Sequence, residues 1–481
     1  MPTTAIVWLR RDLRLNDNPA LLHARLRYQR VIPACIPVIA TGDAAAAPRA
    51  VDAWRRYALQ GLAEQLQSLG SDLIVRPADT ALAGLRALIR ETGAHAVFWN
   101  RRYEPDAIKT DGDIKHSLRA LGLTVKSFKG GLLYEPWEIQ TQHGKPFRVF
   151  TPFWKRLLNN LSATGGASAV RALPAPDALP PIPHPLRSRH NADYAPRPQD
   201  AALAARWHWP PTTAGAAQRI AHLRDRLQHY ATQRDLPALD ATACLSPYLH
   251  CGQLSPRQIL AALPLTLPGA EPFIRQLAWR EFSHHLLYHF PHTAHHPLDT
   301  RFEQFPWRDW ADNADQLQAW RTGQTGIPLV DAGMRQLYAT GWMHNRVRMA
   351  AASLLTKNLL IDWRIGAAWF MDKLVDADLA QNTLGWQWIA GCGADAAPYF
   401  RVFNPVRQGQ KFDADGDYIK AWAPELARLP AKALHAPWTA SAQTLSQAGV
   451  RLGVNYPHPI VDLSRSRQRA LSAYDRIKTT A

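Results

Sequence analysis

Apolar and polar residues in the first 130 positions alternate between two periods. Short apolar runs suit strands buried on both faces of a parallel sheet, and apolar residues every three to four positions suit amphipathic helices. We predict strands at residues 6–9, 31–39, 73–75, 96–99 and 123–128, and helices at residues 50–69, 80–90 and 105–121. Because Pro33 and Pro37 interrupt the second strand, we place that strand near a sheet margin. Strand and helix in alternation predict right-handed βαβ crossovers and a doubly wound, Rossmann-like parallel sheet.

The rest of the chain has a different pattern. Residues 160–215 are rich in Pro and Ala and predict a long, partly extended connector. Beyond residue 216 the strand signals fade, and helical periodicity is found at residues 216–233, 256–263, 271–289, 329–340, 345–360 and 365–375. We therefore predict an α/β + all-α architecture with a Rossmann-like domain at 1–131, an interdomain linker at 132–215 and an all-helical domain at 216–481.

Composition narrows the class of protein. The 481 residues are 47% hydrophobic, which is enough for a sizeable core. The sequence contains no run of about 18 apolar residues, so we predict no membrane span. The four cysteines form no CxxC pair and the N-terminus does not resemble a signal peptide, which favours a reducing cytoplasm. Lys and Arg exceed Asp and Glu by 56 − 39 = 17, which favours a polyanionic partner such as nucleic acid, although a basic surface also serves solubility.

Two local patterns carry little weight. Residues 391–396 read GCGADA and fit the glycine pattern of a dinucleotide site, but they lie in a helical region without the strand that such a site needs. Glu281, His285 and His289 are spaced for one helix face, as metal ligands often are, yet no further ligand can be named. We predict no metal site.

One constellation is harder to explain by packing. Residues 340–349 read TGWMHNRVRM and combine aromatic, amide and guanidinium groups, and residues 376–388 read DADLAQNTLGWQW. A face that meets an anionic cofactor or DNA needs such groups, whereas a core helix does not. We expect Arg348 to pair with Asp376.

These segments resemble the DNA photolyase/cryptochrome family, and most of all its bacterial class I cyclobutane pyrimidine dimer photolyases. Further matching segments are WLRRDLRLNDNPAL at 8–21, FTPFWK at 150–155, YLHCGQLSPRQ at 248–258, WREF at 279–282, DWR at 362–364 and DAAPYFRVFNP at 395–405. The resemblance covers nearly the whole chain. It implies an α/β domain, a long linker and a helical domain that binds FAD, in agreement with the pattern above.

The resemblance implies where FAD binds. The implied cofactor-binding residues are Tyr230, Thr242, Ala243, Cys244, Leu245, Ser246, Phe273, Arg348, Asp376, Ala377, Asp378 and Asn382. Asn382 matches the position beside flavin N5, where an amide can hydrogen-bond either redox state. Blue-light absorption and electron donation are then the cofactor's chemistry, because ordinary side chains cannot supply them.

The resemblance also implies a catalytic and a DNA-binding set. The catalytic set comprises Trp310, Trp363 and Trp386 as an electron-transfer chain, together with Asn382, Gln276 and Met349. The DNA-binding set comprises Arg234, Trp279, Asn345, Arg346, Trp388 and Arg401. The implied reaction is light-driven repair of a pyrimidine dimer in UV-damaged DNA by electron transfer from reduced FAD, after the dimer has been flipped out of the duplex. We expect a deoxyribodipyrimidine photo-lyase that acts as a monomer without a membrane partner.

The chain departs from the family pattern at two sites. Position 276 is Gln, where similar dimer photolyases usually carry Glu and Gln is more typical of (6-4) photolyases, so a (6-4) photoproduct photolyase stays open as an alternative. A cryptochrome-type blue-light receptor, which would share the FAD and the tryptophans, also stays open. An antenna chromophore is implied at Tyr103, Glu104 and Asp106, but Asp106-Ala107 replaces the Asn-Glu of folate-binding relatives. A second chromophore, methenyltetrahydrofolate or a deazaflavin, is therefore expected without a choice between the two, and a flavin or no antenna stays open as well.

Overall fold

The computed structural model describes residues 3–38, 49–182, 195–207, 209–396 and 400–478. The chain forms two compact units that are interleaved along the sequence. The first unit comprises Met1–Phe147, Thr151–Leu227 and Ala243–Pro291, and the second comprises Arg148–Phe150, Gln228–Thr242 and His292–Ala481. The domain boundaries expected from the sequence, at residues 131 and 215, stay predictions.

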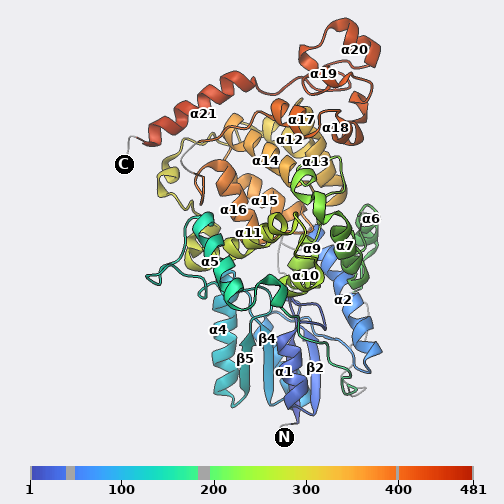
Figure 1. The fold of residues 1–481 in the computed structure, drawn as a ribbon, viewed down its shortest axis with the longest axis vertical. Coiled ribbons are helices and arrows are strands. Elements are labelled where there is room, and N and C mark those ends of the chain that lie inside the picture. Colours follow the sequence, from blue (N-terminus) through green and yellow to red (C-terminus); the bar gives the residue numbers. More distant parts are fainter. Residues whose placement is uncertain (1–2, 39–48, 183–194, 208, 397–399, 479–481) are drawn as a thin grey trace. The chain divides into compact units, whose positions relative to one another are not determined.

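The first unit contains a five-stranded parallel sheet (Figure 1). Its strands are β1 (Thr4–Trp8), β2 (Arg30–Cys35), β3 (Ile74–Val75), β4 (Ala96–Asn100) and β5 (Thr124–Phe128), in the order β3-β2-β1-β4-β5. The order reverses between β1 and β4, which are adjacent. The predicted doubly wound sheet is thus confirmed, with its topological switch point at the carboxyl ends of β1 and β4.

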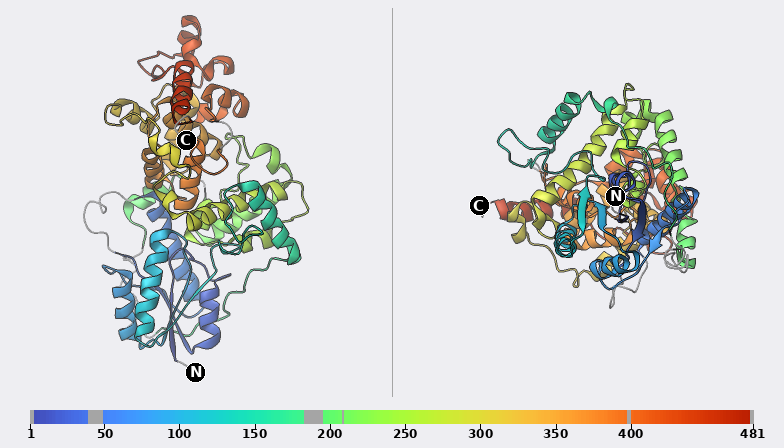
Figure 2. Two further views of the ribbon diagram at one scale, coloured as in Figure 1. Left: turned by 90° about the vertical axis from the view of Figure 1, so that its left-hand side faces the viewer. Right: turned by 90° about the horizontal axis from the view of Figure 1, so that it is seen from below.

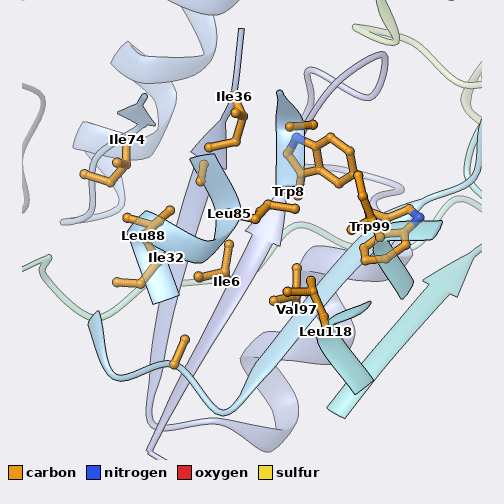
Figure 3. Close-up of a cluster of buried hydrophobic side chains, with 14 of the residues drawn as sticks. Ile6, Trp8, Ile32, Ile36, Ile74, Leu85, Leu88, Val97, Trp99 and Leu118 are labelled. Atoms are coloured by element: carbon orange, nitrogen blue, oxygen red, sulfur yellow. The ribbon is translucent and has the colours of Figure 1, made fainter. Parts of the chain in front are cut away.

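Helices cover both faces of this sheet (Figure 2). They are α1 (Pro19–Arg27), α2 (Ala50–Ser68), α3 (Ala81–Thr92) and α4 (Pro105–Ala120). On one face Ile6 and Val97 of the strands share a buried cluster with Leu85 of α3 and Leu118 of α4 (Figure 3). On the other face the Phe98 ring contacts His23 of α1 at 4.9 Å between centroids. Successive strand residues therefore alternate between two buried faces, as the continuous apolar runs predicted.

The prediction that the proline-containing strand lies near a sheet margin is confirmed, because β2 is the neighbour of the edge strand β3. β2 lies inside the sheet, and Pro33 is in register with Val7 of β1. Proline is accommodated because β3 is short and pairs only with Ala34 and Cys35. The strand on the other side of β2 therefore begins just beyond Pro33, whose missing N–H costs no ladder bond there.

Further helices complete the first unit. They are α6 (Pro198–Ala204), α7 (Thr213–Arg226), α9 (Ser246–Cys251), α10 (Pro256–Ala262) and α11 (Ala270–His289), together with most of α5 (Phe150–Ala163). Ser255 and Gln258 form a capping box at the start of α10, which explains why a helix begins at this Ser-Pro pair.

The second unit is helical in the part that the structure describes. Its α-helices are α8 (Tyr230–Gln233), α12 (Ala314–Thr322), α13 (Pro328–Thr340), α14 (Asn345–Ser353), α15 (Trp363–Lys373), α16 (Leu379–Ala390), α17 (Pro405–Phe412), α18 (Asp417–Trp422), α19 (Ala431–Leu434), α20 (Ala442–Ala448) and α21 (Leu463–Lys478). A π-helical turn, Leu354–Asn358, continues α14. Across the described residues of both units, every helix is too short or too polar to cross a lipid bilayer.

Candidate functional site

The residues singled out from the sequence are divided between the two units. The first unit holds Tyr103, Glu104, Asp106, Ala243, Cys244, Leu245, Ser246, Phe273, Gln276 and Trp279. The second unit holds Tyr230, Arg234, Thr242, Trp310, Asn345, Arg346, Arg348, Met349, Trp363, Asp376, Ala377, Asp378, Asn382, Trp386, Trp388 and Arg401.

The predicted pairing of Arg348 with Asp376 is confirmed. Nη2 of Arg348 lies 3.0 Å from Oδ2 of Asp376, and Nε of Arg348 donates to the carbonyl of Met343 at 2.7 Å. The carboxylate is 6% exposed and the guanidinium 23%. A buried carboxylate therefore fixes a guanidinium that still presents a polar edge, which suits an anionic or strongly polar ligand group.

The start of α16 carries two more of the expected flavin contacts. The Asp378 side chain accepts a hydrogen bond from the N–H of Gln381 at 3.0 Å and so caps the helix. One turn later, Nδ2 of the half-buried Asn382 donates to the carbonyl of Ala367 in α15 at 3.0 Å. This bond fixes which end of the amide is the donor, so its carbonyl oxygen points the other way as an acceptor.

In the first unit, the expected cofactor segment adopts an unusual backbone. Cys244 has a φ of 50°, in the left-handed region that few residues other than Gly adopt. Nε of Arg219 donates to the carbonyl of the preceding Ala243 at 3.2 Å, and α9 begins at Ser246. A turn of this shape directs successive backbone groups to one side, as a phosphate or ribose contact requires.

Helix α11 carries three of the expected residues of the first unit. Phe273 is buried, and the Trp279 ring packs edge-on against Phe282 at 5.9 Å. Gln276 is half-buried, and its Nε2 donates to the carbonyl of Pro272, four residues earlier, at 3.1 Å. The Gln276 amide therefore bonds back to its own helix.

The three expected relay tryptophans differ in burial. Trp386 and Trp363 are buried, whereas Trp310 is 51% exposed, so the set includes one ring at the surface. The aromatic rings that touch Trp386 are Phe370, at 5.0 Å, and Trp320, at 6.2 Å. Trp320 is fully buried, and sequence reasoning did not single it out.

Two of the expected DNA-binding arginines, Arg234 and Arg346, lie in one hydrogen-bonded group. Nη2 of Arg346 lies 2.6 Å from Oδ2 of Asp235, which also neighbours Arg234 at 3.7 Å. His344 joins the same two segments, because its Nδ1 accepts the N–H of Arg346 and its Nε2 lies 3.0 Å from the Arg234 carbonyl. Burial lowers the pKa of the His344 imidazole to about 4.

Sequence reasoning quoted His344 within a motif without giving it a role, and it did not find Asp235. The buried imidazole joins the backbones of the two arginine segments, and Asp235 holds the Arg346 guanidinium. The only sequence signal for His344 was its place in the TGWMHNRVRM segment, and Asp235 had only its neighbour Arg234.

Trp388 is held near the other end of α16. Its Nε1 donates to the carbonyl of Asp395 at 3.2 Å, its ring packs against Phe403 at 6.2 Å, and the Arg401 guanidinium lies 5.6 Å from its centroid. Among the remaining expected residues, Asn345 contacts Met349 through Nδ2 and Sδ at 3.8 Å on α14.

The expected antenna residues do not converge on one point. Tyr103 is buried, and burial together with the neighbouring Glu135 holds the pKa of its hydroxyl well above the usual value. Glu104 pairs with Arg11, and Asp106 is exposed in the first turn of α4. These three side chains thus occupy different environments near the carboxyl end of β4.

The two low-weight patterns have structural explanations. Oε2 of Glu281 accepts the N–H groups of Leu133 and Tyr134, and His285 and His289 both lie about 3 Å from the Pro136 carbonyl. Within the described residues, no group of three or more His, Cys, Asp or Glu side chains is arranged to hold a metal ion. The glycine-rich segment 391–396 follows the C-terminus of α16, where Gly391 has a φ of 91° and ends the helix.

Comparison with known proteins shows the family. Residues 5–177 match the family model for DNA photolyase, and residues 273–476 match the model for the FAD binding domain of DNA photolyase. A deoxyribodipyrimidine photo-lyase of Agrobacterium fabrum (strain C58) is 44% identical, over 99% of this chain and 98% of its own. The chain belongs to the DNA photolyase/cryptochrome family. Its helical half is an FAD-binding domain.

Two further relatives show the breadth of the family. Cryptochrome-2 of Arabidopsis thaliana is 38% identical over 99% of this chain and 80% of its own length. The crystal structure of a bacterial class III photolyase from Agrobacterium tumefaciens is 42% identical, with a TM-score of 0.91 over 100% of this chain and 98% of that one. The comparisons therefore support a photolyase, but not the class I membership expected from the sequence.

Proposed function

We propose that this family member repairs cyclobutane pyrimidine dimers in DNA in a light-driven reaction, as a deoxyribodipyrimidine photo-lyase of class III. The observation that carries the proposal is its 44% identity with a protein of that name along essentially the whole of both chains. When bound, reduced FAD supplies an excited electron donor whose electron splits the cyclobutane ring and then returns.

The chain's own residues prepare the flavin environment. Arg348, fixed by Asp376 and the Met343 carbonyl, would supply positive charge to an anionic reduced flavin bound beside it. Asn382, whose Nδ2 bonds to Ala367, offers its carbonyl oxygen to the N–H that a reduced flavin carries at N5. Both groups thus favour the reduced form, which is the electron donor. Tyr230, residues 242–246 and Phe273 are proposed to contact the rest of FAD.

Trp310, Trp363 and Trp386 would serve as the intermediate rings through which electrons reach a bound flavin. Indole is among the most easily oxidised side chains, and an electron that crosses a protein needs intermediate rings. We propose that Trp310 is the exposed entry point and that Trp363 and Trp386 are the buried steps.

The DNA-facing groups divide into two roles. Arg234, Arg346 and Arg401 contact backbone phosphates and so position the duplex without reading its sequence. We propose that Trp279, Trp388 and Met349 pack against the flipped dimer and that Asn345 and Gln276 hydrogen-bond its polar edges. A dimer stacks and pairs poorly, so its flipping costs less than that of intact bases.

A second chromophore fits the first unit. The indole N–H groups of Trp8 and Trp99 are buried without a hydrogen-bond partner among the described residues, at the carboxyl ends of β1 and β4. Ligands of doubly wound sheets bind at this edge. We propose that a folate or a deazaflavin binds there near Tyr103 and Glu104. The four free, buried cysteines fit a cytoplasmic enzyme, which we expect to act as a monomer.

One experiment tests the proposal. The purified protein is expected to be yellow, and to remove cyclobutane dimers from UV-irradiated DNA under near-ultraviolet or blue light but not in the dark. A flavin-containing protein that leaves dimers intact in light would instead indicate the blue-light receptor, and repair of (6-4) photoproducts alone would indicate the third candidate.

A further inference from the structure

The glycine-rich segment 391–396 closes the end of α16. The N–H groups of Gly391, Cys392 and Gly393 all donate to the carbonyl of Gln387, at 2.9, 3.0 and 3.0 Å. A Cβ on Gly393 would lie 2.8 Å from the Gln387 side chain and 3.0 Å from the backbone nitrogen of Trp388. Glycine is therefore required at 393 for close approach, and the segment folds tightly back onto the turn that carries Trp388.

Asp395 lies in this segment with a strained backbone. Its φ of 56° is in the left-handed region, which Asp tolerates better than most residues but at a cost of about 1 kcal/mol. Oδ2 of Asp395 accepts the N–H of Phe150 at 2.8 Å. The side-chain bond thus holds the backbone of Asp395 in an otherwise unfavourable conformation.

The carbonyl of the same residue accepts the indole N–H of Trp388 at 3.2 Å. Phe403 packs against the indole ring, and the guanidinium of Arg401, two residues earlier in the same segment, lies over that ring. The Phe403 N–H in turn donates to Oγ of Ser353 at 3.1 Å. Trp388 is therefore held by the hydrogen bond of its indole N–H, by the packing of its ring against Phe403, and by the α16 backbone that carries it, although its side chain is only half-buried.

We propose that Asp395 is a positioning residue for the dimer pocket: its side chain anchors the 391–396 segment so that its carbonyl fixes the orientation of Trp388. This inference rests on the proposed function, because it takes Trp388 as the stacking surface for the dimer. A half-buried indole without this bond would adopt several rotamers, and a stacking surface loses affinity when it must first be ordered.

The test compares three substitutions by their affinity for dimer-containing and undamaged duplexes. In Asp395→Asn the amide oxygen still accepts the Phe150 N–H and Asn tolerates a positive φ, so the preference for dimers should stay within about twofold of the parent. Asp395→Ala removes the acceptor and should reduce that preference about tenfold, which corresponds to about 1.4 kcal/mol. Affinity for undamaged DNA should not change, since phosphate contacts dominate it.

Asp395→Gly keeps the backbone conformation without the anchor and should also lose preference for dimers; if it retains the parent's preference, the anchor plays no part and the proposal is overturned. The same variant carries the test if the alanine variant does not fold. Circular dichroism and the thermal midpoint check folding in every case.

Action through Trp388 is checked in a double-mutant cycle. Phe has no indole N–H to donate to the Asp395 carbonyl. In a Trp388→Phe background, Asp395→Ala should therefore cause no further loss of the preference for dimer-containing DNA. Full additivity of the two losses would overturn the proposal. A parent protein without any preference for dimers would instead contradict the proposed function itself.

Discussion

His344 shows how a single buried side chain can make the stability of the fold depend on pH. Its neutral ring bonds to both the Arg234 and the Arg346 segment, and burial lowers the pKa of the imidazole to about 4. An imidazole in the unfolded chain has a pKa of about 6.5 and is protonated first on acidification. The contribution of His344 to stability is therefore present above pH 6.5 and is lost progressively as the pH falls towards 4.

At pH 5 this linkage is expected to lower the free energy of unfolding by about 2 kcal/mol relative to pH 7.5. Urea unfolding at the two pH values, in the parent and in His344→Asn, measures it. The variant lacks the titrating group, so its pH dependence should be smaller by that amount. An equal pH dependence in the two proteins would show that another group is responsible.

Gln276 is the second residue with a specific consequence. Its Nε2 bonds to the Pro272 carbonyl, a bond that a carboxylate cannot make. Gln276→Glu should free the side chain to accept hydrogen bonds from the dimer as a charged, stronger acceptor. We expect more dimers repaired per absorbed photon, measured by actinometry with saturating DNA. Equal yields would exclude Gln276 as a limiting feature of repair.

The sequence predicted which residues belong to the site better than it predicted which residues support them. The resemblance pointed to Arg348 and Asp376 as a pair, and the pair is present. Asp235, Trp320 and Asp395 were missed because each acts through a residue that is distant in sequence or through a backbone carbonyl. No local pattern records such contacts.

Helices α15 and α16 approach each other closely where Gly366 faces Trp386. A Cβ on Gly366 of α15 would lie 2.1 Å from Cη2 of Trp386 and 2.6 Å from Leu355. Gly385, in contrast, is an exposed position of α16 where an added Cβ would have no neighbour within 4 Å. The two glycines thus offer a matched pair of substitutions.

Gly366→Ala should destabilise the protein by about 1–3 kcal/mol, because the ring of Trp386 must move. It should also slow photoreduction of the flavin, measured by absorbance under continuous light with an external reductant. Gly385→Ala is expected to raise stability by up to about 1 kcal/mol through helix propensity and to leave photoreduction unchanged. Equal behaviour of the two variants would contradict a close contact at Gly366.

The long periodic elements were predictable and the others were not. Thr80 and Gly93 delimit α3 as predicted, because a Thr that caps the N-terminus and a Gly that takes up the left-handed conformation after the C-terminus are both local sequence signals. α16 was not predicted because its residues are apolar on nearly every side and show no helical period. The prolines indicated that β2 lies near the sheet margin, but local sequence could not show that the short β3 forms the edge beside it, because that depends on strand pairing.

For the molecule as a whole, the excess of 17 positive charges bears on DNA affinity. Three arginine–phosphate contacts predict a plot of log affinity against log salt with a slope of about −3. Arg401→Gln should reduce the magnitude of that slope by about one. Arg428→Gln, an equal change of charge at an exposed position, should leave it unaltered. Filter binding between 50 and 300 mM salt, taken as about the useful range, distinguishes the variants; identical slopes would remove Arg401 from the interface.

The interleaved order of the two units has a consequence for synthesis. Every segment of the first unit has been made once Pro291 has left the ribosome, whereas Gln228–Thr242 belongs to the second unit and precedes part of the first. Since chains fold from the N-terminus as they emerge, this short stretch must wait, without its final neighbours, until His292–Ala481 follows. Premature termination after the first unit would therefore yield a product that retains the sheet but leaves Tyr230 and Arg234 without the helices that surround them.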